Sequence, residues 1–325
     1  MSAQLDTLSA VAPQGPSLYA KEGPARGLHA LHMKEKRFPL SIARNNPKLG
    51  AMWSQAKTLT WDAATDIAYA DFDHSKYSKE QLDAGRLCWS RRAWTEYTGI
   101  VESPALCIRL CLEGNQSIEA KFLLAAKVFE EARHCEASFL LAEAMGGYVQ
   151  EPPPGDAIQK MLVAGFRDRM AFNPEVTSES AIAGWHCISE GIAYDIFQAR
   201  YLRTTEPTAK EVIRLISQDE VRHVELGWAY LEQRTKEMSR SEVLKIEAVV
   251  RDVIENVELK GFHATFMLAD AETSILREAE AIAADARLGF CPADEEHEVF
   301  VKSIQRIRER FAPMGIKIPV YPEIE

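Results

Sequence analysis

The sequence predicts an all-α protein whose centre is a four-helix bundle with one long crossover. Apolar residues recur with a helical period along most of the chain after residue 77, and only two short strand-like alternations appear. The long periodic segments form two closely connected pairs, and about thirty residues separate one pair from the other. Because short connections make helices antiparallel neighbours, the pattern indicates two helical hairpins joined by a crossover.

The first hairpin is predicted over residues 78–112 and 117–145. Ser78 and Gln81 have the spacing of a capping box, in which each residue bonds the backbone of the other at a helix start. Gly146 follows the second periodic segment and is a natural helix stop.

The crossover contains three consecutive prolines and a short predicted helix that reaches about Met170. The third bundle helix is predicted over 178–203. The fourth is predicted over 208–236, with Thr208 and Glu211 as its capping box. These two helices form the second hairpin.

Additional helices are predicted after the bundle. One begins at Ser239, where Glu242 completes a capping box, and its pattern continues to about Leu288. A last helix is predicted over 295–311, and the tail after it is extended.

We divide the chain into three parts on this basis. Residues 1–77 are an N-terminal arm, punctuated by proline and glycine, that we expect to pack on the main domain. Residues 78–288 are the helical domain. Residues 289–325 are a C-terminal helix and tail.

The composition excludes several classes of function. The chain has 325 residues and a net charge of −10 without basic blocks, so it is a poor candidate for binding nucleic acid or an anionic membrane. It shows no run of about eighteen apolar residues and no secretory signal pattern. Its six scattered cysteines include no CxxC pair, which is typical of reduced thiols, so we expect a cytoplasmic protein.

One motif of acidic residues, arginine and histidine occurs twice. Residues 130–136 and 219–225 both read acid-Glu-x-Arg-His-x-Glu, and they contain the only two Glu-x-x-His spacings in the chain. They also occupy equivalent places in the two predicted hairpins. Since the leading acid, the arginine and the final glutamate are shared as well, the pattern indicates an internal duplication rather than chance.

The spacing of this motif is suited to metal binding. A glutamate and a histidine three residues apart lie on neighbouring positions of one helix face, so both can reach one ion. The pairs here are Glu131 with His134 and Glu220 with His223. Two such helices, with one glutamate from each of the other two, form a site for two metal ions in a bundle core.

The hypothesis therefore requires an upstream carboxylate on each of the other two helices. Glu190 lies thirty residues before Glu220 of the second motif. For the first motif there are two candidates, Glu102 and Glu96, which lie twenty-nine and thirty-five residues before Glu131. The similarity of 100–105 to 188–193 favours Glu102, and Glu96 remains the alternative.

At these residues the sequence resembles the ferritin-like di-iron carboxylate proteins, over residues 78–236. The resemblance implies a ferritin-like bundle and six metal ligands, namely Glu102, Glu131, His134, Glu190, Glu220 and His223. It also implies that Glu130 and Asp219 accept hydrogen bonds from the histidines across the bundle and so orient them.

At two positions the sequence differs from the motifs of particular di-iron families. Ser138 stands where ribonucleotide reductase small subunits carry a radical tyrosine, and Ile216 stands where arylamine N-oxygenases carry a third histidine. His186, one turn before Glu190, is either a seventh ligand or a hydrogen-bond partner. Tyr194 either lines a substrate pocket or packs in the core. The long extensions resemble those of N-oxygenase-like proteins and monooxygenase hydroxylase subunits.

Three other charged residues of the motif helices have simpler interpretations. Lys127 stands one turn before Glu131 and predicts an ordinary i,i+4 ion pair. Arg133 and Arg222 are interpreted as partners in surface or inter-helix ion pairs rather than as substrate clamps.

The resemblance implies an O₂-dependent oxidoreductase that hydroxylates, N-oxygenates or oxidatively cleaves a small organic substrate. Its cofactor would be two iron ions, with Mn/Fe or two manganese ions also compatible. Electrons would come from a separate reductase or ferredoxin, and we expect a homodimer. The histidines bind metal as neutral imidazoles, so binding should weaken at low pH. The alternatives are a ferroxidase or peroxide-scavenging protein of the rubrerythrin kind, and a non-catalytic metal-binding scaffold.

Overall fold

The computed structural model describes residues 45–112, 117–152, 170, 173, 175–268, 274–322 and 324–325. The regular elements among these residues are all helices, which confirms the predicted all-α class. None of the described helices is long and apolar enough to cross a membrane. The helix predicted inside the crossover and the first 44 residues of the predicted arm lie outside the described residues.

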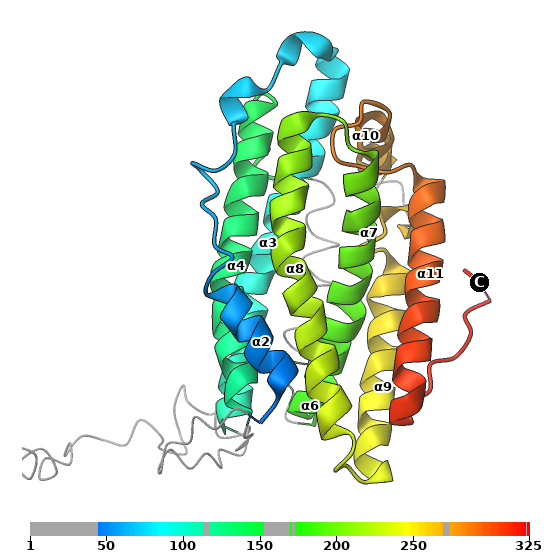
Figure 1. Cartoon of the computed structure of the whole chain (residues 1–325). Coiled ribbons are helices and arrows are strands. Elements are labelled where there is room, and N and C mark those ends of the chain that lie inside the picture. The colour runs from blue at the N-terminus through cyan, green and yellow to red at the C-terminus, as the bar shows by residue number, and fades with distance from the viewer. Residues whose placement is uncertain are drawn as a thin grey trace, which may run out of the picture.

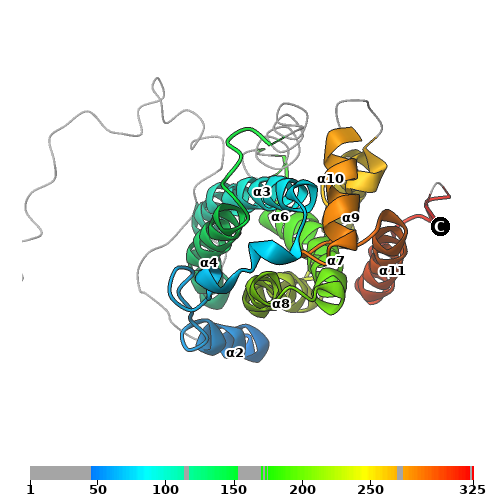
Figure 2. The ribbon, with the colours of Figure 1, turned by 90° about the horizontal axis from the view of Figure 1, so that it is seen from above.

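The bundle consists of α3 (Lys79–Leu112), α4 (Ile118–Ala144), a composite third helix and α8 (Pro207–Arg234). The third helix starts as α6 (Ser178–Ile182), continues through a π-helical segment (Ala183–Ser189) and becomes α7 (Glu190–Arg203). The four run side by side in Figure 1 and surround a common centre when seen from above in Figure 2. The predicted four-helix bundle is therefore confirmed.

Local signals explain where the first and fourth bundle helices begin. Ser78 and Gln81 make both reciprocal bonds of the capping box at the start of α3. The predicted cap of α8 at Thr208 is wrong, because the N-cap lies two residues earlier. Glu206 is the N-cap and accepts from the backbone N–H of Ala209, and Pro207 occupies the first turn, where its missing N–H costs nothing.

The helix predicted from Ser239 to Leu288 is interrupted, which corrects the sequence interpretation. Its first part, α9 (Arg240–Asn256), has the predicted capping box. After α9 the described residues form two short 3₁₀ turns (Glu258–Lys260 and Thr265–Met267), and α10 (Ser274–Asp285) comes later. Gly261 in this break has φ +87°, a left-handed conformation that glycine adopts without strain. Phe262 and His263, which lie within the break, contact a cavity lined by bundle residues.

Two further helices cover the bundle. α11 (Ala293–Phe311) packs beside α7, and α2 (Pro47–Ala56) lies across α4 and α8 (Figure 1). Asn46 caps α2, and its side-chain amide donates to the carbonyl of Ala229 in α8 at 2.9 Å. This bond ties the start of the described chain to the bundle.

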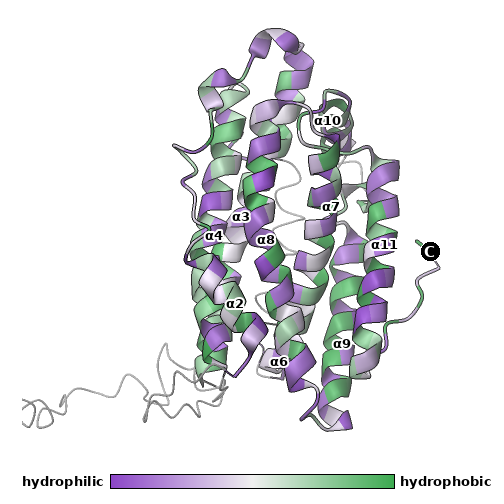
Figure 3. Ribbon diagram, viewed as in Figure 1, coloured by the Kyte–Doolittle hydropathy of each residue, from purple (hydrophilic) through white to green (hydrophobic). Residues whose placement is uncertain are grey.

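The apolar core is divided along the bundle axis. One buried cluster includes Leu124 of α4 and Leu231 of α8, and a second includes Leu141 of α4 and Ile213 of α8. The two copies of the repeated motif lie between these positions, and Figure 3 shows hydrophilic and hydrophobic residues interspersed along both helices. The buried charged side chains therefore form a layer between two apolar layers.

Candidate metal centre

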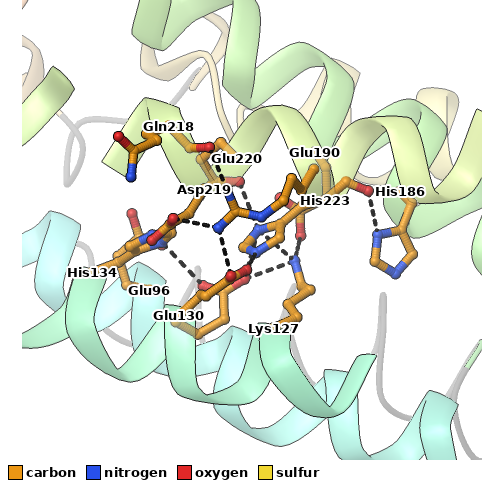
Figure 4. A network of polar contacts seen from close by, with 12 residues as sticks. Glu96, Lys127, Glu130, His134, His186, Glu190, Gln218, Asp219, Glu220 and His223 are labelled. Atoms are coloured by element: carbon orange, nitrogen blue, oxygen red, sulfur yellow. Dashed lines mark hydrogen bonds and ion pairs between the residues drawn. The ribbon is translucent and has the colours of Figure 1, made fainter. Parts of the chain in front are cut away.

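Two groups of potential metal ligands lie in this polar layer (Figure 4). One consists of Glu96, Glu131, His134 and Glu220, and the other of Glu131, Glu190, Glu220 and His223. Within each group the donor atoms all lie within 4.8 Å of one another, and every side chain is buried. Glu131 and Glu220 belong to both groups. We therefore treat them as two halves of one site, the Glu96 half and the Glu190 half.

α3 contributes Glu96 to the site, in the position for which the duplication favoured Glu102. Both side chains are buried, but of the two only Glu96 belongs to a donor group, and its Oε2 lies 3.9 Å from Nδ1 of His134. Six residues along a helix turn a side chain by about 120°, so the two cannot face the same neighbour. Gly99 marks the inward side, because a Cβ there would overlap with the carboxyl group of Glu131. The geometry thus brings Glu96, and not Glu102, together with the other predicted donors.

Each histidine is held by an acidic residue of the opposite helix. Nε2 of His134 on α4 lies 3.2 Å from Oδ2 of Asp219 on α8, and Nε2 of His223 on α8 lies 2.8 Å from Oε2 of Glu130 on α4. Nδ1 of both rings then faces Glu220, at 3.3 Å for His134 and 3.0 Å for His223. Because Nε2–H donates to the acidic partner, Nδ1 is the nitrogen available to a metal.

A second set of polar contacts surrounds Asp219. Nη2 of Arg133 lies 2.8 Å from its Oδ2, and Arg222 bridges Asp219 and Glu130. The two arginines therefore form inter-helix ion pairs, in a buried setting. Trp61 also donates from Nε1 to Oδ2 of Asp219, at 2.9 Å. No sequence signal pointed to Trp61, because it stands in a segment without periodicity before α3.

Lys127 lies inside the Glu190 half. Its Nζ is 2.7 Å from Oε1 of Glu131 and 3.3 Å from Nδ1 of His223, and it also contacts Oε1 of Glu190. The pair with Glu131 is the predicted i,i+4 contact. Its complete burial and its contact with the third bundle helix could not be read from the sequence, because Glu190 is 63 residues away.

His186 and Tyr194 belong to neither donor group. Nδ1 of His186 lies 2.9 Å from the backbone carbonyl oxygen of His223, so its ring bonds α8 rather than the donor atoms. Gly227 permits this approach, since a Cβ there would lie 2.6 Å from Cβ of His186. Tyr194 lines another cavity, between α7, α8 and α11, together with Trp228.

The charges of the centre perturb the ionisation of its members. Burial works to raise the pKa of Glu220, but His223 and His134 hold it well below its ordinary value. Burial and Lys127 work to lower the pKa of His223, but the carboxylates of Glu220 and Glu130 raise it to about 9. The carboxylates therefore create a potential that favours cationic groups at this depth in the protein.

A cavity opens beside the four donor carboxylates. Its remaining wall comes from α3, the third bundle helix and the break after α9, and consists of Arg92, Thr95, Thr98, Gly99, Trp185, Ser189, Ala193, Phe262 and His263. Nδ1 of His263 lies 3.0 Å from Oε2 of the buried Glu258, and Arg92 contacts Oε1 of Glu96. The break that the sequence interpretation missed thus completes the cavity.

The donor set fits two divalent or trivalent metal ions. Four carboxylates buried this closely are costly unless cations compensate them. Two shared carboxylates, with one histidine and one further carboxylate in each half, supply oxygen and imidazole donors to two positions. Such donors suit iron and manganese and do not by themselves select between them.

The comparison with solved structures supports the fold. No protein family and no curated protein matches the chain. Among solved structures, an R2-like ligand-binding oxidase with a metal cofactor superposes with a TM-score of 0.63 at 14% identity, over 83% of this chain and 94% of that chain. A variant of such an oxidase with an aerobically reconstituted Mn/Fe cofactor gives 0.64 at 14% identity, over 85% and 97%.

The chain therefore has the ferritin-like helical fold of the R2-like ligand-binding oxidases, with a carboxylate and histidine cluster in the bundle core. At this level of identity the likeness concerns the fold.

Proposed function

We propose that this protein is a di-metal oxidase that uses O₂ to oxidise a small organic substrate. The observation that carries the proposal is the pair of donor groups that share Glu131 and Glu220. In this proposal the ligands are Glu96, Glu131, His134, Glu190, Glu220 and His223. Two iron ions are the first candidate, and Mn/Fe is the second because the similar solved structures are described with that cofactor.

The metal pair, when bound, would supply the reaction with O₂ and the oxidising equivalents. The chain's own residues hold and orient the ligands. Asp219 and Glu130 present Nδ1 of the two histidines to the metals. Arg133 and Arg222 hold these two acidic residues in place, because each arginine contacts at least one of them.

The cavity beside the carboxylates is the proposed substrate site. Its wall combines aromatic faces, Trp185 and Phe262, with the hydroxyls of Thr95, Thr98 and Ser189. Such a wall suits a small organic molecule with an apolar body and a few hydrogen-bonding groups. Whether the oxidation is hydroxylation, N-oxygenation or cleavage depends on the bond that this cavity presents to the metals.

Two partners complete the proposal. A separate reductase or ferredoxin would supply electrons for turnover. A second copy of the chain would form a homodimer, for which α3 and α4 offer four exposed large apolar side chains, Tyr97, Ile108, Phe129 and Phe139.

The test is anaerobic loading with Fe(II), followed by metal analysis and rapid mixing with O₂ under optical detection. We expect two metal ions per chain and a transient visible absorption band that Glu220→Ala abolishes. Glu225→Ala is the control, because Glu225 lies on the same helix but pairs with Arg310. One metal ion or none would contradict the proposal.

The same experiment separates the alternatives. Oxygen uptake that no organic substrate alters would favour a ferroxidase or a peroxide-scavenging protein. Two tightly bound metal ions without any reaction with O₂ would favour a structural metal site.

A further inference from the structure

A lysine ammonium is built into one half of the metal centre. Lys127 is fully buried, and its Nζ lies 2.7 Å from Oε1 of Glu131, lies 3.3 Å from Nδ1 of His223 and contacts Oε1 of Glu190. All three partners are donors of the Glu190 half, and Figure 4 shows the side chain reaching up from α4 among them. The ammonium is thus located where the donors of this half converge.

The Glu96 half is arranged differently. The cation near it is Arg92, which contacts Oε1 of Glu96 and lines the cavity, outside the donor group. Oε2 of the same glutamate remains directed at Nδ1 of His134, 3.9 Å away. In the Glu96 half, Arg92 contacts one ligand from outside the donor group. In the Glu190 half, Lys127 lies among the donor atoms themselves.

An ammonium and a metal ion cannot share the Glu190 half in this arrangement. A metal ion needs its carboxylate and imidazole ligands at about 2.0–2.2 Å, and Lys127 holds the same atoms in hydrogen bonds. Two positive charges a few ångströms apart in a buried site also repel strongly. The metal can enter only if the ammonium leaves, for which lysine has a flexible stem. The ring of Trp185, centred 5.9 Å from Nζ, offers an adjacent face for the displaced cation.

We propose that Lys127 is a built-in competitor of the second metal ion, so that the two halves of the centre load in a fixed order. The first ion binds in the Glu96 half. The second binds in the Glu190 half and more weakly, because it has to displace the ammonium. This inference rests on the proposed metal centre but not on the proposed reaction with O₂.

The test is an anaerobic equilibrium titration with Co(II), followed by its visible absorption and by metal analysis after dialysis. For the wild type we expect two steps whose dissociation constants differ by about tenfold or more. Lys127→Met should tighten the second step by about tenfold or more and leave the first unchanged. Lys127→Arg keeps the charge and should keep the second step weak.

Matched variants assign the steps and control for substitution alone. His134→Ala should remove the tight step, and His223→Ala should remove the weak step. Lys121→Met, on the same helix but outside both donor groups, should change neither. Thermal unfolding followed by circular dichroism shows whether each variant is folded.

Several results would overturn the inference. Two Co(II) binding steps with equal dissociation constants in the wild type would overturn it, even if Lys127→Met failed to fold. Unchanged affinities in a folded Lys127→Met variant would do so as well. If the wild type bound no Co(II), the metal centre itself would be refuted and this inference with it. If the steps behaved as expected but O₂ never reacted, only the proposed function would fail.

Discussion

Asp219 of α8 lies 3.2 Å from Nε2 of His134 on α4, so a residue beside one donor glutamate positions the histidine of the other motif copy. The second copy returns the contact through Glu130 and His223. Since the acidic residue immediately precedes the motif glutamate in both copies, the duplication explains this reciprocity. The two motifs therefore form one structural unit, in which neither histidine is oriented by its own helix alone.

Asp219→Asn should weaken metal binding by about 10–100-fold, because loss of an orienting carboxylate lowers the affinity of a histidine ligand by about that factor. The affinity is measured by titration with a divalent metal ion. Asp195→Asn is the control, since Asp195 accepts from Ser303 on the outer side of α7. An unchanged affinity in Asp219→Asn would mean that the contact with His134 does not orient the ring.

Glu96 and Glu102 provide a direct test of the ligand set. Glu96→Ala should lower the bound metal from two ions per chain to about one, because it removes the terminal carboxylate of one half. Glu102→Ala should retain both ions. The two residues are equally buried on the same helix, 5% exposed each, so they control for one another. Metal analysis that gave the reverse result would restore the assignment suggested by the duplication.

Gly227→Ala should destabilise the protein by about 1–3 kcal/mol, as overpacking of a tight core does. The new Cβ would lie 2.6 Å from Cβ of His186 and 2.9 Å from Sγ of Cys187, so α8 and the π-helical segment would have to separate. Gly191→Ala is the control, because its Cβ would meet only Ile307 at 3.7 Å. Chemical denaturation measures the free energy of unfolding of both variants. Equal values would show that the close approach of α8 to the π-helical segment does not limit the residue at position 227.

Glu296 should make stability depend on pH. Burial raises its pKa from 4.5 to about 7, against the opposing effect of Arg200, whose Nε lies 2.8 Å away. Between pH 4.5 and 7 the folded protein holds a proton that the unfolded chain has released. The stability from this group is therefore complete below pH 4.5 and is lost as pH rises toward 7.

Glu296→Gln removes this titration, so the variant should gain stability relative to the wild type between pH 5 and pH 7. We expect a relative change on the order of 1 kcal/mol in the free energy of unfolding, since one pKa unit corresponds to about 1.4 kcal/mol. Glu295→Gln is the control, because its exposed side chain pairs with Arg203. A difference between wild type and Glu296→Gln that does not vary with pH would contradict this assignment.

Much of the fold could be predicted because helices are specified locally. The capping boxes at Ser78 and Ser239 depend on residues three positions apart, and both are present in the structure. The break after Asn256 was missed because a single Gly261 with positive φ, against which Leu268 packs, leaves no periodic trace in the sequence. For the same reason the cavity wall that Phe262 and His263 form could not be anticipated.

By itself the sequence determined the all-α class, the two motif copies and five of the six proposed ligands. These features follow from residue spacings within one helix or from the similarity of the two predicted hairpins. Only the tertiary structure shows that Glu96, rather than Glu102, lies beside the other donors, since the inward side of α3 depends on how Gly99 packs against Glu131. It also decided the place of Lys127, whose partner Glu190 comes from another helix. Contacts between helices depend on the packing of whole surfaces, and no spacing along the chain records them.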